Sequence, residues 1–186
     1  EPDFDDPKTR NEKVLWMLLH ADTSQWTLLA DKYRVREYVE SRGLGHLLNE
    51  LYGVWESADR IDFDALPDQF VMKTNNGYGD VSIITDKHSV DTEALRRKFD
   101  RMLRRRFGRM TGEHHYLSIP PRIIAEKLLV PDTDAGLIDY KIYCFDGEPR
   151  FCVVVYDRIT PADTTEELYE LPDWKDRNAE ILDFDR

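Results

Sequence analysis

The sequence predicts an α+β protein, with helices and antiparallel strands in largely separate stretches of the chain. Helix-like patterns fill the first 42 residues, and short runs rich in β-branched and aromatic residues begin near residue 69. Two of these runs, 139–145 and 150–156, flank a turn sequence at 146–149 and predict a hairpin. With 186 residues and 41% hydrophobic content, the chain can bury one sizeable core or two small lobes.

Two helices are expected near the N-terminus. Thr9 and Glu12 have the spacing of a capping box directly before an apolar run, which predicts a helix over about 10–20. Residues 25–42 carry apolar and aromatic side chains at helical spacing among charged ones, so they predict a second helix. Gly43 is its expected end.

A third helix is expected from Asp91 or Thr92 to about Phe107, and it concentrates positive charge. The net charge of −11 argues against general nucleic-acid binding, yet eight Lys/Arg and one acid lie between Arg96 and Arg109. One apolar stripe should leave the arginines of this helix on its solvent face. That face is either an ordinary solvated surface or a docking surface for an anionic glycan or a membrane leaflet.

The most informative segment is 70–80, where a predicted strand ends at Lys73 and a glycine-containing loop follows. A strand-held ammonium beside flexible backbone N–H groups is typical of phosphate sites. In a Walker A loop the glycines precede the lysine, and in protein kinases they lie well upstream of it. The order here therefore indicates a third kind of nucleotide site, with an ordinary Asn-Gly hairpin turn into a strand at 81–84 as the alternative.

Later segments supply two more candidate regions. Residues 122–129 predict a strand that runs into a connector, and Asp139 and Lys141 alternate with Tyr140 on the first hairpin strand. Both polar side chains should thus point to one face, where an exposed ion pair is the alternative to a functional role. The last thirty residues are acidic and weakly patterned.

Taken in order, these segments resemble the ATP-grasp superfamily, and within it the TupA-like family named for teichuronopeptide biosynthesis. The matching stretches are 32–39, 61–73, 122–128 and 139–147, and together they cover most of residues 7–158. The resemblance implies two lobes, each a mainly antiparallel sheet with packed helices, and a nucleotide in the cleft between them. It divides the chain into an N-terminal helical region (1–60), a small lobe (61–130) and part of a second lobe (131–186).

The resemblance also implies ATP as a bound substrate and assigns residues to it. Lys73 would contact the α- and β-phosphates, Lys141 would lie near the phosphates with Asp139 orienting it, and Arg158 would stabilise the transferred phosphoryl group, unless it is a surface arginine. The glycine loop would cover the phosphates through backbone N–H groups; its residues are Asn75, Asn76, Gly77, Tyr78, Gly79 and Asp80. The connector would read the adenine edge, with Asp132 or Asp134 at the ribose unless both are solvated loop acids; its residues are Glu126, Lys127, Leu128 and Leu129.

Magnesium is where the chain departs from the family pattern. The resemblance implies metal-binding Arg-Val-Asp and Gly-Glu strands late in the chain, and neither occurs before Arg186. Several late polar residues lack a strand-like context; they are Asp173, Asp176, Asn178, Glu180, Asp183 and Asp185. The expectation is a sequence cut short, with a genuinely shortened protein as the alternative.

The implied activity is an ATP-dependent carboxylate–amine ligase that works through an acyl-phosphate. Its substrates would be small-molecule or glycan-linked carboxylates and amines in cell-envelope or capsular polymer assembly. The alternatives are a non-catalytic nucleotide- or glycan-binding module and a phosphotransferase on the same fold. With only Cys144 and Cys152, and no apolar run of bilayer length, the chain is expected in the cytoplasm without a transmembrane segment.

Overall fold

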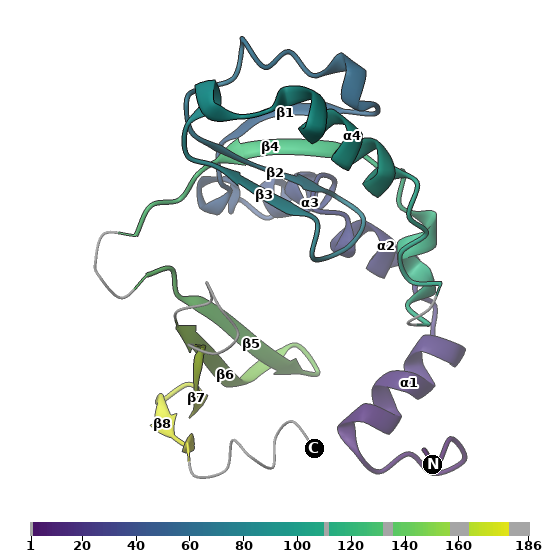
Figure 1. The fold of residues 1–186 in the computed structure, drawn as a ribbon. Coiled ribbons are helices and arrows are strands. Elements are labelled where there is room, and N and C mark those ends of the chain that lie inside the picture. Colours follow the sequence, from purple (N-terminus) through teal and green to yellow (C-terminus); the bar gives the residue numbers. More distant parts are fainter. Residues whose placement is uncertain (1, 110–111, 132–135, 157–163, 179–186) are drawn as a thin grey trace. The chain divides into compact units, whose positions relative to one another are not determined.

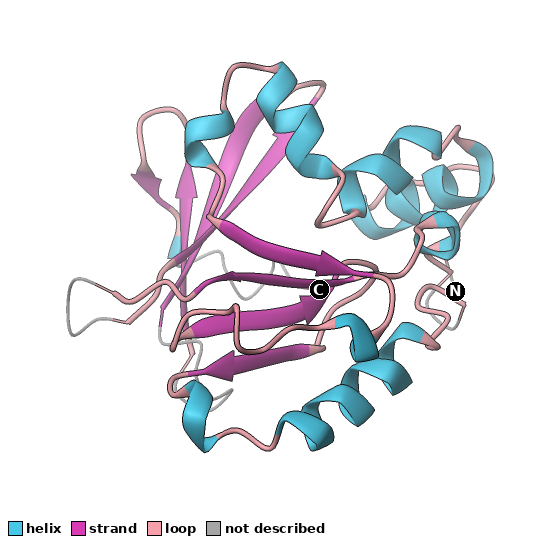
Figure 2. Ribbon diagram, turned by 90° about the horizontal axis from the view of Figure 1, so that it is seen from above, coloured by secondary structure: helices cyan, strands magenta, loops and turns pink. Residues whose placement is uncertain are grey.

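The structure is a computed structural model that describes residues 2–109, 112–131, 136–156 and 164–178. The chain forms two compact units, residues 1–128 and 129–186. Each unit contains a four-stranded antiparallel sheet (Figure 1). The expected α+β architecture with two antiparallel sheets is confirmed, and Figure 2 shows the helices lying beside the strands rather than within the sheets. No helix in the described part of the chain is long and apolar enough to cross a membrane.

The sheet of the first unit has the strand order β1-β4-β2-β3. Its strands are β1 (Leu51–Trp55), β2 (Phe70–Thr74), β3 (Val81–Ile84) and β4 (Ile123–Lys127). The register places one residue of each strand in a row across the sheet: Val54, Ile124, Lys73 and Val81. Directly paired residues share a face, so these four side chains point to the same side.

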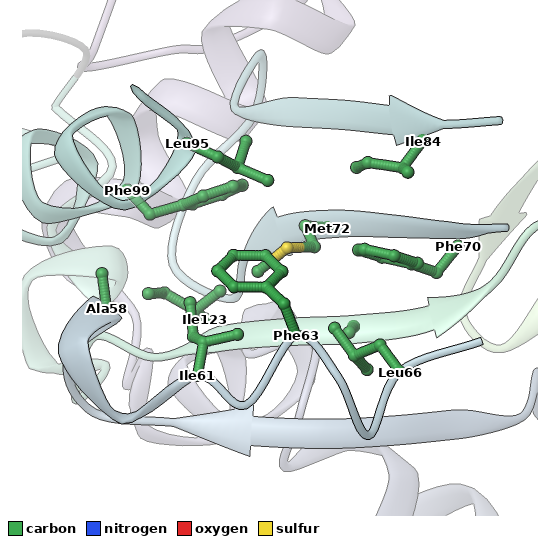
Figure 3. Packing of buried hydrophobic residues seen from close by; sticks show 11 residues of the cluster. Ala58, Ile61, Phe63, Leu66, Phe70, Met72, Ile84, Leu95, Phe99 and Ile123 are labelled. Atoms are coloured by element: carbon green, nitrogen blue, oxygen red, sulfur yellow. The ribbon is translucent and has the colours of Figure 1, made fainter. Parts of the chain in front are cut away.

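The other face of this sheet packs against α4 (Thr92–Leu103). Figure 3 shows Leu95 and Phe99 of α4 directed at Phe70 and Met72 of β2. Full burial of such side chains stabilises a fold by about 1.5–3 kcal/mol each. Because successive strand residues alternate between faces, packing Phe70 and Met72 into the core directs Lys73 to the opposite side.

The helix expected to reach Phe107 ends earlier, at Leu103. Beyond it Phe107 packs edge-to-face against Tyr78 with ring centroids 4.5 Å apart, a contact that requires the chain to leave the helical path. Gly108 follows with φ +86°, where an added Cβ would lie 2.3 Å from the carbonyl oxygen of Glu113. Gly108 therefore shapes the turn after the helix and does not cap it.

The N-terminal helix α1 (Arg10–His20) begins at the predicted capping box. The hydroxyl of Thr9 accepts from the N–H of Glu12 at 3.2 Å, and Glu12 Oε2 accepts from the N–H of Thr9 at 2.9 Å. Both partners lie within one helical turn, so this start could be predicted from local sequence.

The single helix expected over 25–42 is instead two, α2 (Ser24–Ala30) and α3 (Val35–Ser41). Asp31 causes the break, because its Oδ1 accepts from the N–H groups of Tyr33 at 2.9 Å and Arg34 at 3.2 Å. Such a side-chain turn competes with continued helix. Gly43 follows α3 with φ +74°, as expected for a residue just past a helix end. Short 3-10 helices connect later elements: η1 (Gly45–Leu47), η2 (Ala58–Arg60), η3 (Lys87–Ser89) and η4 (His114–Ser118).

The second unit has the strand order β5-β6-β7-β8. Its strands are β5 (Asp139–Phe145), β6 (Glu148–Tyr156), β7 (Thr165–Glu170) and β8 (Lys175–Asp176). The predicted hairpin is confirmed, but its turn is only Asp146-Gly147, with φ +50° and +81°. Positive φ at both central positions is what a tight two-residue hairpin requires, so Pro149 lies inside β6.

Strands β7 and β8 fall in the stretch that was expected to be weakly patterned. Leu168 is the buried residue of β7, and it packs with Val153 and Val155 of β6 in a small core. One apolar residue among five polar or aromatic ones gives almost no alternation. The pairing with β6, and not its own pattern, establishes β7 as a strand.

Candidate functional site

Lys73 and Glu126 form a close ion pair on the sheet face opposite α4. The two residues lie on neighbouring strands, β2 and β4, and Lys73 Nζ is 2.5 Å from Glu126 Oε2. Their side chains are 25% and 10% exposed. The other carboxylate oxygen of Glu126 is 3.6 Å from Nη1 of Arg36. Glu126, expected to support the adenine amine, is thus held between two cations of the first unit.

A second lysine, Lys32, belongs to the same cluster and was given no role from the sequence. It lies in the turn between α2 and α3, and its Nζ donates to the carbonyl oxygen of Gly77 in the glycine loop. Burial lowers the pKa of Lys32, and the nearby charge of Lys73 lowers it further. The signal that could have identified Lys32 is its place at the start of the matching stretch 32–39.

Asn75 anchors the glycine loop from inside the protein. Its side chain is fully buried, donating to Asp31 Oδ1 at 2.8 Å and to the carbonyl of Pro120 at 3.0 Å, and accepting from the N–H of Arg122 at 2.6 Å. Its backbone N–H donates to the carbonyl of Arg122 and its carbonyl accepts from the N–H of Lys32. Every polar group of Asn75 is therefore committed to protein partners.

The rest of the loop keeps its backbone donors. The N–H groups of residues 76–79 make no hydrogen bond to another described residue. Gly79 has φ +81°, a conformation that favours glycine. Successive uncommitted N–H groups in such a loop can surround phosphate oxygens, as the sequence predicted.

The far side of the loop is attached to the segment after α4. Asp80 is buried, and its Oδ1 is 2.9 Å from Nη1 of Arg105. Phe107 packs on Tyr78, and an added Cβ on Gly77 would lie 2.8 Å from the Phe107 ring. The loop is thus held by a charge pair and an aromatic contact as well as by its own backbone.

Apolar side chains continue the sheet face beside the cations. Val81 and Ile83 of β3 share the face of Lys73 by register, and they are 48% and 65% exposed. Cations, free backbone donors and an apolar strip are three features that a nucleotide requires for its phosphates and its base. All three lie within the first unit.

The connector offers its backbone only in part. Lys127 donates through its N–H to the carbonyl of Glu50 at 2.9 Å and accepts at its carbonyl from Asn49 Nδ2 at 2.8 Å. Leu128 and Leu129 make no backbone hydrogen bond to another described residue. Their groups are the ones available to a base edge, and the expected ribose contacts, Asp132 and Asp134, lie outside the described residues.

In the second unit, Asp139 and Lys141 lie on β5 and point to one face. Their direct cross-strand partners on β6, Val155 and Val153, share that face. Lys141 Nζ is 3.5 Å from Glu166 Oε1 in a half-exposed ion pair. Arg158 lies outside the described residues. The meeting of these residues with Lys73 in one cleft stays a prediction.

Metal ligands were the remaining expectation. Within the described ranges, no group of three or more His, Cys, Asp or Glu side chains is arranged to hold a metal ion. Asp173 and Asp176 belong to no such group, and the magnesium site that the resemblance implies stays a prediction. Glu180, Asp183 and Asp185 lie outside the described residues.

A family model described as TupA-like ATPgrasp matches residues 12–176, which is most of the chain. The match covers most of the first unit and most of the second, and it includes Lys32, Lys73 and the glycine loop. Neither a curated protein nor a solved structure gives a significant match.

Proposed function

The chain belongs to the TupA-like ATP-grasp family, and from that membership we propose that it is an ATP-dependent carboxylate–amine ligase. The observation that carries the proposal is the convergence of Lys32 and Lys73 on a loop whose backbone donors are uncommitted. This arrangement suits a triphosphate. The setting we propose is the assembly of a cell-envelope or capsular polymer.

The reaction has two balanced steps. A carboxylate oxygen of the acid attacks the γ-phosphorus of ATP, ADP leaves, and an acyl-phosphate forms. An amine then attacks the acyl carbon, inorganic phosphate leaves, and the nitrogen loses a proton to give the amide. Little covalent chemistry falls to the protein, so positioning and charge neutralisation supply most of the rate.

Each part of the first unit has a proposed task in these steps. Lys32 and Lys73 neutralise the phosphates, and the loop N–H groups from Asn76 onward bind their oxygens. Glu126 keeps the Lys73 ammonium on the sheet face, since their atoms are 2.5 Å apart. The base packs on Val81 and Ile83, and the backbone of the connector reads its edge.

The second unit adds Lys141 and Arg158 near the transferred phosphoryl group, with Asp139 orienting Lys141. Asp132 or Asp134 binds the ribose. Proteins of the ATP-grasp fold generally bind magnesium together with ATP, and the metal would neutralise phosphate charge. Within the described ranges no group of three or more His, Cys, Asp or Glu side chains marks a place for the metal, and no step proposed for this chain is routed through it.

The basic segment is proposed as a contact for an anionic glycan. One of its arginines does not face solvent as expected: Arg96 donates to the carbonyls of Ala58 and Ile61, whereas Arg105 pairs with Asp80 and stays more than half exposed. Three further exposed arginines are Arg97 and Arg101 of α4 and Arg104 directly after it, which the helical repeat places on one face. No large apolar side chain of α4 is exposed, which favours a glycan over insertion into a membrane.

Two further assignments complete the proposal. The net charge of −11 argues against nucleic acid as a partner. Cys144 and Cys152 are both free, which fits a reducing cytoplasm, where ATP is abundant. The acid and amine substrates are small molecules or groups on a glycan.

Calorimetric titration with a non-hydrolysable ATP analogue tests the nucleotide site. Lys73→Ala should weaken binding by about tenfold or more, because a charge-assisted phosphate contact is worth at least about 1.4 kcal/mol. Lys13→Ala is the control, since Lys13 is exposed on α1. Equal binding by wild type and Lys73→Ala would contradict the proposed site.

Product analysis separates the ligase from its alternatives. Mass spectrometry after incubation with ATP, acid and amine should detect an amide together with ADP and phosphate. A phosphorylated acceptor would indicate a phosphotransferase, and binding without any turnover would indicate a non-catalytic module. The non-catalytic module is included as an outcome because the described residues contain no group of three or more metal-ligating side chains.

A further inference from the structure

A cavity of about 550 Å³ opens on the first unit at the edge of the sheet formed by β1 and β4. Its lining residues are Tyr33, Val54, Trp55, Glu56, Arg60 and Arg122. Pockets of about 300–1,000 Å³ suit small ligands. None of their side chains has a role in the nucleotide site described above, where only the backbone of Arg122 takes part, so the cavity is a separate feature.

Two positional relationships relate this cavity to the proposed phosphate site of Lys73 and the glycine loop. Val54 lies in the same cross-sheet row as Lys73, separated from it only by Ile124. Val54 and Lys73 therefore point to one face of the sheet, about 10 Å apart at about 4.8 Å per strand, whereas the lining residue Trp55 packs against the core on the other side. Arg122 exchanges backbone hydrogen bonds with Asn75, where the glycine loop begins.

The charges of the cavity favour an anion. Arg60 and Arg122 provide two guanidinium groups against the single carboxylate of Glu56, which leaves one net positive charge. The guanidinium of Arg60 makes no ion pair or hydrogen bond with another described residue. The Arg122 guanidinium lies 5.1 Å from the centre of the Tyr33 ring, a stacking that fixes the orientation of its donors.

Glu56 shows which group fits beside Arg122. Its Oε1 lies 3.6 Å from Nη2 of Arg122, so a carboxylate already occupies this position. The Glu56 side chain is 72% exposed, and exposed ion pairs contribute at most about 1 kcal/mol. A carboxylate from solution can therefore displace Glu56 at little cost.

We propose that this cavity binds the carboxylate of the acid substrate through Arg60 and Arg122, with Glu56 as the residue that it displaces. The ligand class is a small organic acid whose carbon skeleton packs against Val54 and Trp55. This inference rests on the proposed ligase function, because it adds the site for the group that ATP activates. Unlike the ligase function, the acid site can be tested without a nucleotide.

The test is amide NMR on the whole chain, with succinate, L-glutamate and D-glucuronate as probes. Each acid should shift the backbone amides of residues 54–60 and 122, whereas the fully esterified forms should not. Arg60→Gln and Arg122→Gln should each weaken binding by about tenfold, because each removes the charge-assisted hydrogen bonds of one guanidinium to the carboxylate. Glu56→Gln should tighten it, because the competing carboxylate is gone.

Control variants separate this role from folding. Arg42→Gln removes an exposed arginine of the first unit that lies outside the cavity and should leave acid binding unchanged. Arg122→Lys keeps the charge but loses the forked donor geometry, so it should recover only part of the affinity. Arg122→Gln and Arg122→Lys both keep the backbone N–H and carbonyl of residue 122, which hydrogen-bond Asn75.

Three results would overturn the proposal: no shift with any of the acids, equal shifts with the esters, or weaker binding by Glu56→Gln. Lys73→Ala distinguishes this failure from failure of the nucleotide site. It should retain acid binding while losing affinity for the ATP analogue. Acid binding without any nucleotide affinity in the wild type would leave the cavity assigned and reject the ligase.

Discussion

Asp31 and Asn75, 44 residues apart, are joined by a 2.8 Å hydrogen bond between Oδ1 and Nδ2. The same oxygen of Asp31 accepts from the N–H groups of Tyr33 and Arg34. One carboxylate oxygen thus divides α2 from α3 and fixes the start of the glycine loop. Both side chains are buried, so the bond is shielded from water.

Asn75→Ala should strongly destabilise the first unit. It removes both donors and the acceptor of the amide, leaving Asp31 and the Arg122 N–H with lost partners. Each unsatisfied buried group costs about 1–3 kcal/mol, so the free energy of unfolding should fall by about 2–4 kcal/mol in urea titrations. Asn11→Ala, at an exposed position of α1, is the control. A loss no larger than that of the control would argue against the anchoring role.

Nucleotide affinity should fall toward alkaline pH earlier than an ordinary lysine would cause. Burial and the charge of Lys73 lower the pKa of Lys32, and only the charged ammonium attracts phosphate. Lys32→Arg keeps its charge and should flatten the affinity profile measured by calorimetry with ADP. A profile identical in wild type and Lys32→Arg would show that Lys32 does not contact the phosphates.

The same shift predicts the sign of a stability change. Between the lowered pKa of folded Lys32 and its ordinary value of 10.5, the unfolded chain binds more protons than the folded one. The free energy of unfolding contributed by this residue should therefore rise with pH across that interval. Lys32→Met should remove this contribution in urea titrations at a series of alkaline pH values.

Gly77→Ala should weaken nucleotide binding by displacing the loop. Its added Cβ would lie 2.8 Å from the ring of Phe107, and overpacking of this kind costs about 1–3 kcal/mol. Adding Phe107→Leu should recover part of the affinity, since the smaller side chain leaves room. Gly45→Ala is the control, because its Cβ would meet the flexible Glu40 side chain at 3.3 Å and the Glu40 backbone only at 3.9 Å. Independent, additive effects of the two changes would rule out the contact as the cause.

Tyr169 offers a test within the second unit. Its hydroxyl donates to Glu167 Oε2 at 2.8 Å, and this hydrogen bond raises the pKa of Tyr169 to about 12. Glu167→Gln should return the pKa toward the ordinary value of 10.0, followed by ¹³C NMR of the tyrosine ring during alkaline titration. Glu166→Gln removes the partner of Lys141 instead and should leave Tyr169 unchanged.

Features with local causes could be predicted from the sequence. The start of α1 depends on Thr9 and Glu12, which are three residues apart. The hairpin of β5 and β6 depends on Asp146-Gly147. The break at Asp31 was missed although the side-chain turn onto Tyr33 and Arg34 is local; the third partner of the same oxygen, Asn75, is distant along the chain. Periodicity over 25–42 carries no information about such a partner.

The same division applies to the candidate site. Lys73 and its loop could be identified because lysine, glycines and strand are contiguous. Lys32 was given no role, since its partner Gly77 is 45 residues away, and only its place at the start of the matching stretch 32–39 could have indicated it. The cavity around Arg122 draws its lining from the turn after α2, the region of β1 and η2, and the start of β4. No spacing rule relates such segments, and only the fold brings them together.

The strand order of the first sheet has a consequence for how the protein is made. β4 lies between β1 and β2, yet it is the last of the four strands in the chain. The sheet therefore cannot be completed until residues 123–127, its central strand, have been synthesised. Glu126 reaches Lys73 in the same event, so a growing chain acquires its core and its charged pair together. A chain that ends before residue 123 therefore lacks both the central strand and the carboxylate that pairs with Lys73.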